Sequence, residues 1–169
     1  MAKEIEYANK FSDHCKMILS YARDIAYSLG GTTIEPIHLI LGERQHQYQP
    51  GISDYLFKDN ENTAQIIKRY TKGEPIVIPQ PEELKEEISE KVQRIIRKSY
   101  RWVIKSGFEL VEPYHMFIIM QKVDPYLFND LLENEKKFNS KAFYEKQYGL
   151  DFSAKKPRLM QKILQIFKF

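Results

Sequence analysis

Apolar residues recur with helical spacing in two stretches of the chain that lie 77 positions apart. In each stretch the steps alternate between four and three residues, which places these side chains on one face of an α-helix. The first stretch carries Phe11, Cys15, Ile18, Ala22, Ile25 and Leu29. The second places Ile88, Val92, Ile95, Ser99, Trp102 and Ser106 at the equivalent positions, with serine at two of the six. Both helices are expected to end at a glycine, Gly30 or Gly107, because glycine readily adopts the left-handed conformation of a carboxy-terminal cap.

Each of these helices is followed by the same short motif. Residues 35–38 read Glu-Pro-Ile-His, and residues 112–115 read Glu-Pro-Tyr-His. Proline fits the first turn of a helix, where its missing N–H would have no partner, and it disfavours helix at the preceding residue. The runs after proline, "IHLILG" and "YHMFII", are apolar on most sides, so we expect two buried helices that begin at Pro36 and Pro113.

The two halves are expected to contain four helices each. We place them near residues 12–29, 36–46, 52–58 and 63–71, then near 82–106, 113–121, 124–133 and 140–148. Asn62 and Asn139 are expected to cap the last helix of each half. The acidic run at 81–91 is interpreted as the first turns of the 82–106 helix, with Glu87 supporting Lys91. The sequence therefore predicts an all-α fold, a tandem pseudo-twofold repeat of two four-helix units.

The expected boundaries lie within one globular domain. The first repeat covers 11–72, a proline-rich linker covers 73–81, and the second repeat covers 82–150. A basic amphipathic tail, 153–169, follows. Its net charge is +5, so the formal net charge of +3 leaves −2 on the other residues. Because this body is close to neutral, we expect no nucleic-acid partner.

From the composition and the first residues, we expect the protein to be cytoplasmic. A single cysteine, Cys15, excludes an internal disulfide and fits a reducing compartment. The first ten residues, "MAKEIEYANK", lack the apolar core of a signal peptide, and no apolar run is long enough to span a bilayer.

The region from Phe11 to Gly42 resembles the amino-terminal repeat (Clp-N) of the Clp AAA+ unfoldases. In that family a helix ends in Leu-Gly, and the next helix opens Glu-His-Leu-Leu-Leu-Gly. Here Leu29-Gly30 is followed by "HLILG" at 38–42. The second copy departs from this pattern, with Ser106 before Gly107 and Ile119 in place of the last glycine. The resemblance covers about residues 11–148 and includes the duplication.

The resemblance implies a mobile, non-catalytic domain that receives adaptor proteins or substrates. The chain has no Gly-x4-Gly-Lys-Ser/Thr phosphate loop, so we expect a stand-alone Clp-N protein that does not hydrolyse ATP and needs no cofactor. Its function would be accessory or regulatory to a Clp chaperone–protease. The partners would be Clp ATPase or protease subunits, an adaptor or a substrate, and the binding mode a helix or peptide in an apolar groove between the repeats.

Seven residues are candidates for contact with a partner. In some family members a glutamate directly before the histidine of each copy reads phosphorylated arginine; here Ile37 and Tyr114 occupy those positions. Glu35 and Glu112 lie two residues earlier, where we interpret them mainly as helix caps, so recognition of phosphoarginine by the family's geometry is in doubt. The tail adds Leu159, Ile163 and Phe167.

Three interpretations of the tail remain open. It could pack on the domain as a ninth helix, or dock on a partner or on a second copy of the chain to form a homodimer. We rank binding to an anionic membrane surface last.

His38 and His115 suggest catalysis or metal binding, but neither has a second ligand at the following turn. We expect no metal and interpret both as core histidines that donate to a backbone carbonyl. Cys15 is expected to be buried and inert, and Trp102 to lie in the core of the second repeat.

The abundant aromatic residues form either core or a peptide groove. Alternative functions are a component of another bacterial assembly, such as a secretion system, and, lowest in rank, a small hydrolase.

Overall fold

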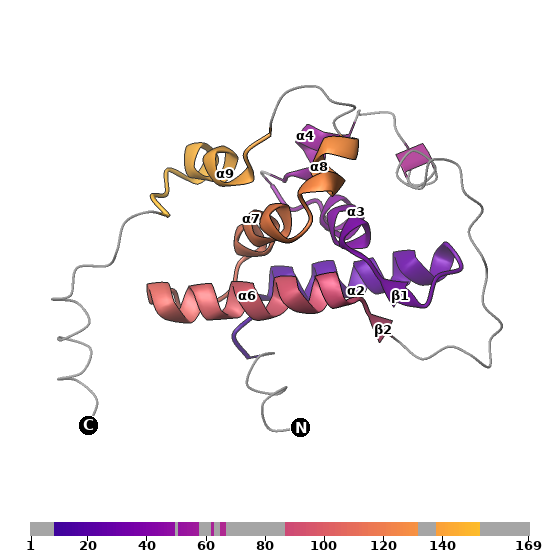
Figure 1. Cartoon of the computed structure of the whole chain (residues 1–169), viewed down its shortest axis with the longest axis horizontal. Coiled ribbons are helices and arrows are strands. Elements are labelled where there is room, and N and C mark those ends of the chain that lie inside the picture. Colours follow the sequence, from indigo (N-terminus) through magenta and orange to yellow (C-terminus); the bar gives the residue numbers. More distant parts are fainter. Residues whose placement is uncertain are drawn as a thin grey trace, which may run out of the picture.

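The computed structural model describes residues 9–49, 51–57, 62, 65–66, 87–131 and 138–152, and it confirms the all-α fold class (Figure 1). The described residues contain seven helices: α2 (Asp13–Ser28), α3 (Pro36–His46), α4 (Ser53–Leu56), α6 (Glu90–Ser106), α7 (Pro113–Val123), α8 (Pro125–Leu131) and α9 (Ser140–Tyr148). They also contain two very short strands, β1 (Thr33–Ile34) and β2 (Glu87–Ile88). The expected linker at 73–81 and the tail at 153–169 lie outside the described residues.

Matching caps delimit the first long helix of each half. The hydroxyl of Ser12 accepts a hydrogen bond from the backbone N–H of Cys15 at 3.4 Å, and that of Ser89 accepts one from Val92 at 3.3 Å. At the other ends, Gly30 and Gly107 have φ angles of 78° and 71°, which confirms the expected left-handed glycines.

The second long helix starts later than the sequence pattern predicts. Residues 87–88 form β2 in place of helix, and α6 begins only at Glu90. Ile88, expected on the core face, is 39% exposed. Glu87 does not share a helix with Lys91, whose ammonium instead pairs with Asp124 at 2.7 Å. The physical reason is that the backbone at 87–88 pairs with β1, so it is not available to the helix.

Each half is joined to the other through its helix starts. β1 and β2 run parallel, with Ile34 opposite Ile88, and Phe11 forms an isolated parallel bridge to Val111. The N–H of Ser89 donates to the carbonyl of Ile34 at 3.2 Å, and that of Ser12 donates to Val111 at 3.0 Å. These two contacts correspond to each other at the sequence offset of 77. The link in each half therefore pairs with the first helix of the other half.

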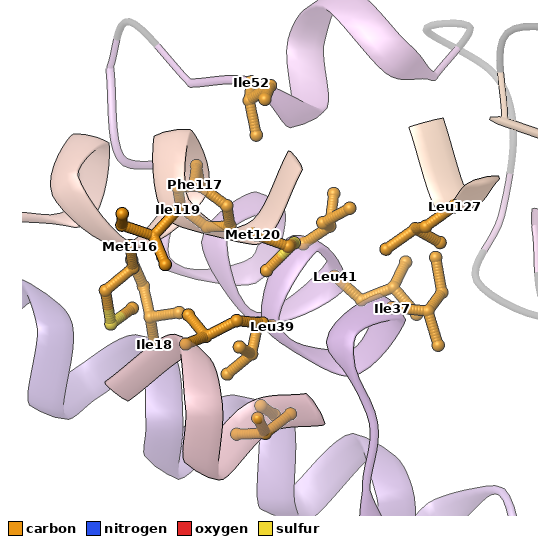
Figure 2. Close-up of a cluster of buried hydrophobic side chains, with 14 of the residues drawn as sticks. Ile18, Ile37, Leu39, Leu41, Ile52, Met116, Phe117, Ile119, Met120 and Leu127 are labelled. Atoms are coloured by element: carbon orange, nitrogen blue, oxygen red, sulfur yellow. The ribbon is translucent and has the colours of Figure 1, made fainter. Parts of the chain in front are cut away.

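The core lies between the halves and is built around α3 and α7, as their apolar runs predict. All residues from Pro36 to Glu43 are buried in α3, as are all residues from His115 to Met120 in α7. Figure 2 shows side chains of both halves in one cluster, with Ile18 and Leu39 close to Met116 and Met120. Burying apolar area of this extent is the main source of folding free energy.

A glycine lets the two helices of the first half approach closely. A Cβ atom at Gly42 would lie 2.5 Å from the carbonyl oxygen of Ile18 and 3.1 Å from the nitrogen of Ala22. Both are backbone atoms of α2, so they cannot move aside as the end of a flexible side chain can. The packing of α2 on α3 therefore requires glycine at this position.

We predict that Gly42→Ala lowers the free energy of unfolding by about 1–3 kcal/mol, because the added methyl group pushes α2 and α3 apart. Urea denaturation followed by circular dichroism measures the change. Gly149→Asn is the control: Gly149 is left-handed, which asparagine tolerates, and nothing lies within 4 Å of its Cβ position. An unchanged midpoint for Gly42→Ala would contradict the close contact of the two helices.

Candidate protein-binding site

The repeated Glu-Pro-x-His motif is a helix-start device. Glu35 is the N-cap of α3 and Glu112 the N-cap of α7, with proline at the first helical position in both. The backbone N–H of Glu35 donates to Nδ1 of His38 at 3.0 Å, and that of Glu112 donates to Nδ1 of His115, also at 3.0 Å. In a capping box this acceptor is usually a glutamate or glutamine side chain, so histidine performs that role here. The interpretation of both glutamates as caps is confirmed.

Both histidines are held in the neutral form. Burial lowers the pKa of His38 to about 4 and that of His115 to about 3. Their hydrogen bonds run opposite to our expectation, since Nδ1 accepts a hydrogen bond from a backbone N–H and does not donate one to a carbonyl. Nε2 of His115 is buried and has no hydrogen-bond partner among the described residues. Within the described structure the geometry assigns the two histidines to capping.

We predict that His115→Gln flattens the acid side of the stability profile. The folded-state pKa of His115 lies below its unfolded value of 6.5, so its contribution is fully present above pH 6.5 and is lost as the pH falls toward about 3. Glutamine can accept the same N–H bond without titrating. Relative to the variant, the wild type should lose about 1.4 kcal/mol per pH unit below 6.5. Unfolding free energies at several pH values test this, and parallel profiles would contradict it.

The two capping glutamates lie where the halves meet. Burial raises the pKa of the half-buried Glu35, against a hydrogen bond from Ser89 and the charge of Lys91, both of which lower it. Burial raises the pKa of the Cys15 thiol, in α2, and the charge of Glu112 raises it further. Both carboxyl groups therefore interact with residues near the start of the first helix of the other half. Both glutamates therefore contribute to the junction between the two halves.

The other candidate residues have different positions. Ile37 is only 1% exposed and belongs to the core, so a partner cannot contact it on this surface. Tyr114, its counterpart in the second half, is partly exposed. Leu159, Ile163 and Phe167 lie outside the described residues.

Partly exposed rings surround His115 and form what we call the aromatic cluster: Trp102, Phe108, Tyr114, Tyr148 and Phe152. The rings of Trp102 and Phe108 meet the imidazole of His115 edge-on, with centroids 5.0 and 4.8 Å away. The ring of Tyr114 lies 5.4 Å from Phe152 and 5.3 Å from Tyr148. Trp102, expected in the core, is therefore at its margin, because α6, α7 and α9 leave one side of this cluster open to solvent.

A buried carboxyl group connects the first half to α9. Oε2 of Glu43 accepts a hydrogen bond from the N–H of Ser53 at 2.7 Å, and Oε1 lies 3.2 Å from the hydroxyl of Tyr144. Burial raises the pKa of Glu43 to about 8, so the group is protonated at neutral pH. Sequence reasoning missed this residue, although a glutamate directly after the apolar run "HLILG" was a usable signal.

We predict that Glu43→Gln stabilises the protein at alkaline pH. The folded-state pKa is raised above the unfolded value of 4.5, so the contribution of Glu43 is full below pH 4.5 and is lost as the pH rises through about 8. Glutamine is neutral like the protonated acid and does not titrate; its carbonyl oxygen can accept the N–H of Ser53, and its amide can donate to the hydroxyl oxygen of Tyr144 in place of the bond that Tyr144 donates to Glu43. The wild type should lose up to about 1.4 kcal/mol per pH unit across this window relative to the variant. Denaturation at pH 5 and at pH 9 provides the comparison, and a destabilised variant at pH 9 would contradict a protonated Glu43.

The single cysteine is also engaged in the structure. The thiol of Cys15 donates to the carbonyl of Val111 at 3.1 Å, and burial raises its pKa to about 12. Among the described residues no group of three or more histidine, cysteine, aspartate or glutamate side chains could hold a metal ion. Within the same residues no helix is both long and apolar enough to cross a bilayer.

Comparison with known proteins supports the fold alone. No protein-family model matches the chain, and no curated protein matches it significantly. A solved structure described as "Preliminary structural investigations of a malarial protein secretion system" superposes with a TM-score of 0.53. The match covers 82% of this chain and 95% of that chain at 21% sequence identity. At this identity the likeness shows a shared fold.

Proposed function

We propose that the chain is a Clp-N-like repeat domain that binds a protein partner without catalysis, as an accessory or regulatory module of a Clp chaperone–protease in the cytoplasm. Two sequence features support this proposal: the first copy carries the Leu-Gly and "HLILG" pattern of the family at Leu29-Gly30 and 38–42, and the Glu-Pro-x-His motif is repeated in the second copy. The matched contacts of Ser12 and Ser89 across the halves agree with a duplicated unit.

The observation that carries the proposal is the aromatic cluster. Its five rings come from three helices and their flanking residues, and all five are partly exposed. Partly exposed aromatic side chains that sit on a packed base are typical of the centres of protein interfaces. Tyr114 belongs to this cluster and occupies the position before the motif histidine, which the family resemblance singles out.

The chemistry of the polar groups favours binding over catalysis. His38 and His115 accept N-cap hydrogen bonds, and Cys15 donates to a carbonyl with its pKa raised to about 12. A general base must instead reach the substrate and works best with a pKa near the working pH, and a nucleophile must be accessible and activated by a neighbouring base or a lowered pKa. The two motif histidines and Cys15 therefore stabilise the fold.

An affinity pull-down from extract of the source cells tests the proposal. We expect the purified full-length chain to recover Clp ATPase or protease subunits, and Tyr114→Ala to reduce this recovery severalfold because it opens a gap in the aromatic cluster. Tyr126→Ala is the matched control, since Tyr126 is 75% exposed on α8 and forms no ring contact with any described residue. A chain truncated after Phe152 shows whether the tail takes part. Absence of Clp subunits from the wild-type sample would overturn the proposal.

A second candidate is a binding component of a protein secretion assembly. The observation that favours it is the shared fold with the structure described as a malarial protein secretion system. Recovery of secretion or envelope components in place of Clp subunits, again dependent on Tyr114, would support this candidate and exclude the first.

A further inference from the structure

Helix α6 carries a continuous row of basic side chains on its outer side. Lys91, Arg94, Lys98, Arg101 and Lys105 follow one another at steps of three, four, three and four residues, and all five are exposed. This spacing keeps them on one face of the helix over about 21 Å. We call this row the basic stripe. Figure 1 shows α6 along the lower edge of the molecule, with α7 above it.

Four of the five charges of the basic stripe have no ion-pair partner among the described residues. Lys91 pairs with Asp124, but Arg94, Lys98, Arg101 and Lys105 form no ion pair with any described residue. Like charges three and four residues apart on a helix repel each other and destabilise it. The helix itself therefore gains nothing from this arrangement, which an anionic partner would relieve.

The duplication supplies an internal comparison. At the offset of 77, the positions of Arg94, Lys98, Arg101 and Lys105 correspond in α2 to Met17, Tyr21, Asp24 and Ser28. None of these is basic, and α2 nevertheless forms a helix of nearly the same length. The fold therefore does not require positive charge at these positions. The basic stripe is a property of one half only.

We infer that the basic stripe is the docking surface for an acidic segment of a partner protein. This inference rests on the proposed function and names the chemistry of its partner. Trp102 lies four residues after Lys98 and three before Lys105, so the basic stripe adjoins the aromatic cluster. The partner segment carries carboxylates along the basic stripe and an apolar side chain that contacts the rings.

Other anionic partners fit the surface less well. The tail and α6 each carry +5, and subtracting both from the net charge of +3 leaves −7 on the other residues. A polyanion larger than the helix, such as duplex nucleic acid or an anionic bilayer, would meet this surrounding negative charge. A short acidic segment confined to α6 would not. The helix also offers only Ile104, 47% exposed, as a large exposed apolar side chain for insertion into lipid.

The experiment uses the purified full-length chain and a labelled peptide of about 15 residues, long enough as a helix to match the basic stripe. The peptide contains alanine, glutamates at steps of three and four, and one terminal phenylalanine. Fluorescence anisotropy gives its Kd, and the emission of Trp102, the single tryptophan, reports contact beside the basic stripe. We expect saturable binding that weakens as salt is raised.

The test variant replaces Arg94, Lys98, Arg101 and Lys105 by glutamine, which keeps helix propensity and removes four charges. We expect its Kd to rise at least about tenfold. The matched control replaces Lys155, Lys156, Lys162 and Lys168 by glutamine, which removes the same charge from the tail and should change the Kd less than about twofold. Circular dichroism of both variants checks that they fold. An Arg94→Lys/Arg101→Lys chain retains the charges and should retain binding.

Three outcomes of the binding experiment would overturn the inference. They are equal binding by the α6 variant and the wild type, loss of binding in the tail variant alone, and tighter α6-dependent binding of duplex DNA or of vesicles containing anionic phospholipid than of the peptide. Pull-down with the α6 variant separates this inference from the proposed function. If the wild type and the α6 variant both recover Clp subunits, the proposed function stands and the basic stripe is not the docking surface.

Discussion

The structure depends on the exchange of backbone hydrogen bonds between the start of each long helix and the link of the opposite half. Ser12 donates to Val111 and Ser89 to Ile34, so the polar backbone groups at both junctions are satisfied only when the two halves are together. This exchange places the start of α3 beside α6 and the start of α7 beside α2. It also closes the space in which α3 and α7 bury almost all of their apolar surface. Neither half could form this core alone.

Several side chains that could take part in catalysis or metal binding instead stabilise that arrangement. The motif histidines cap helices, Cys15 binds the carbonyl of Val111, and Glu43 connects the first half to Tyr144 on α9. Because a buried polar group without a partner is costly, the contacts of Cys15 with Val111 and of Glu43 with Tyr144 also specify how the halves fit together. Within the described part of the chain, the aromatic cluster and the basic stripe of the second half are the surfaces that we propose for partner binding.

The two halves share a backbone pattern and differ in what they expose. The position before the motif histidine holds the buried Ile37 in one half and the partly exposed Tyr114 in the other. The outer side of α2 has both acidic and basic residues, whereas that of α6 is basic along its length. The duplicated core is compatible with both sets of exposed residues. The differences between the two surfaces therefore indicate function and not folding. Averaged net charge concealed the basic stripe, although the spacing of the basic residues from Lys91 to Lys105 was visible in the sequence.

The sequence by itself determined the helices, because spacing and capping act within one or two turns. It predicted α3 at 36–46 and α9 at 140–148 with their observed ends, the left-handed glycines, and the burial of α3 and α7. Tertiary structure alone decided that residues 87–88 form a strand, that Trp102 lies at the margin of the core, and that Glu43 meets Tyr144, which is 101 positions away. These outcomes depend on which distant segments pair across the halves, and a local pattern carries no information about that pairing.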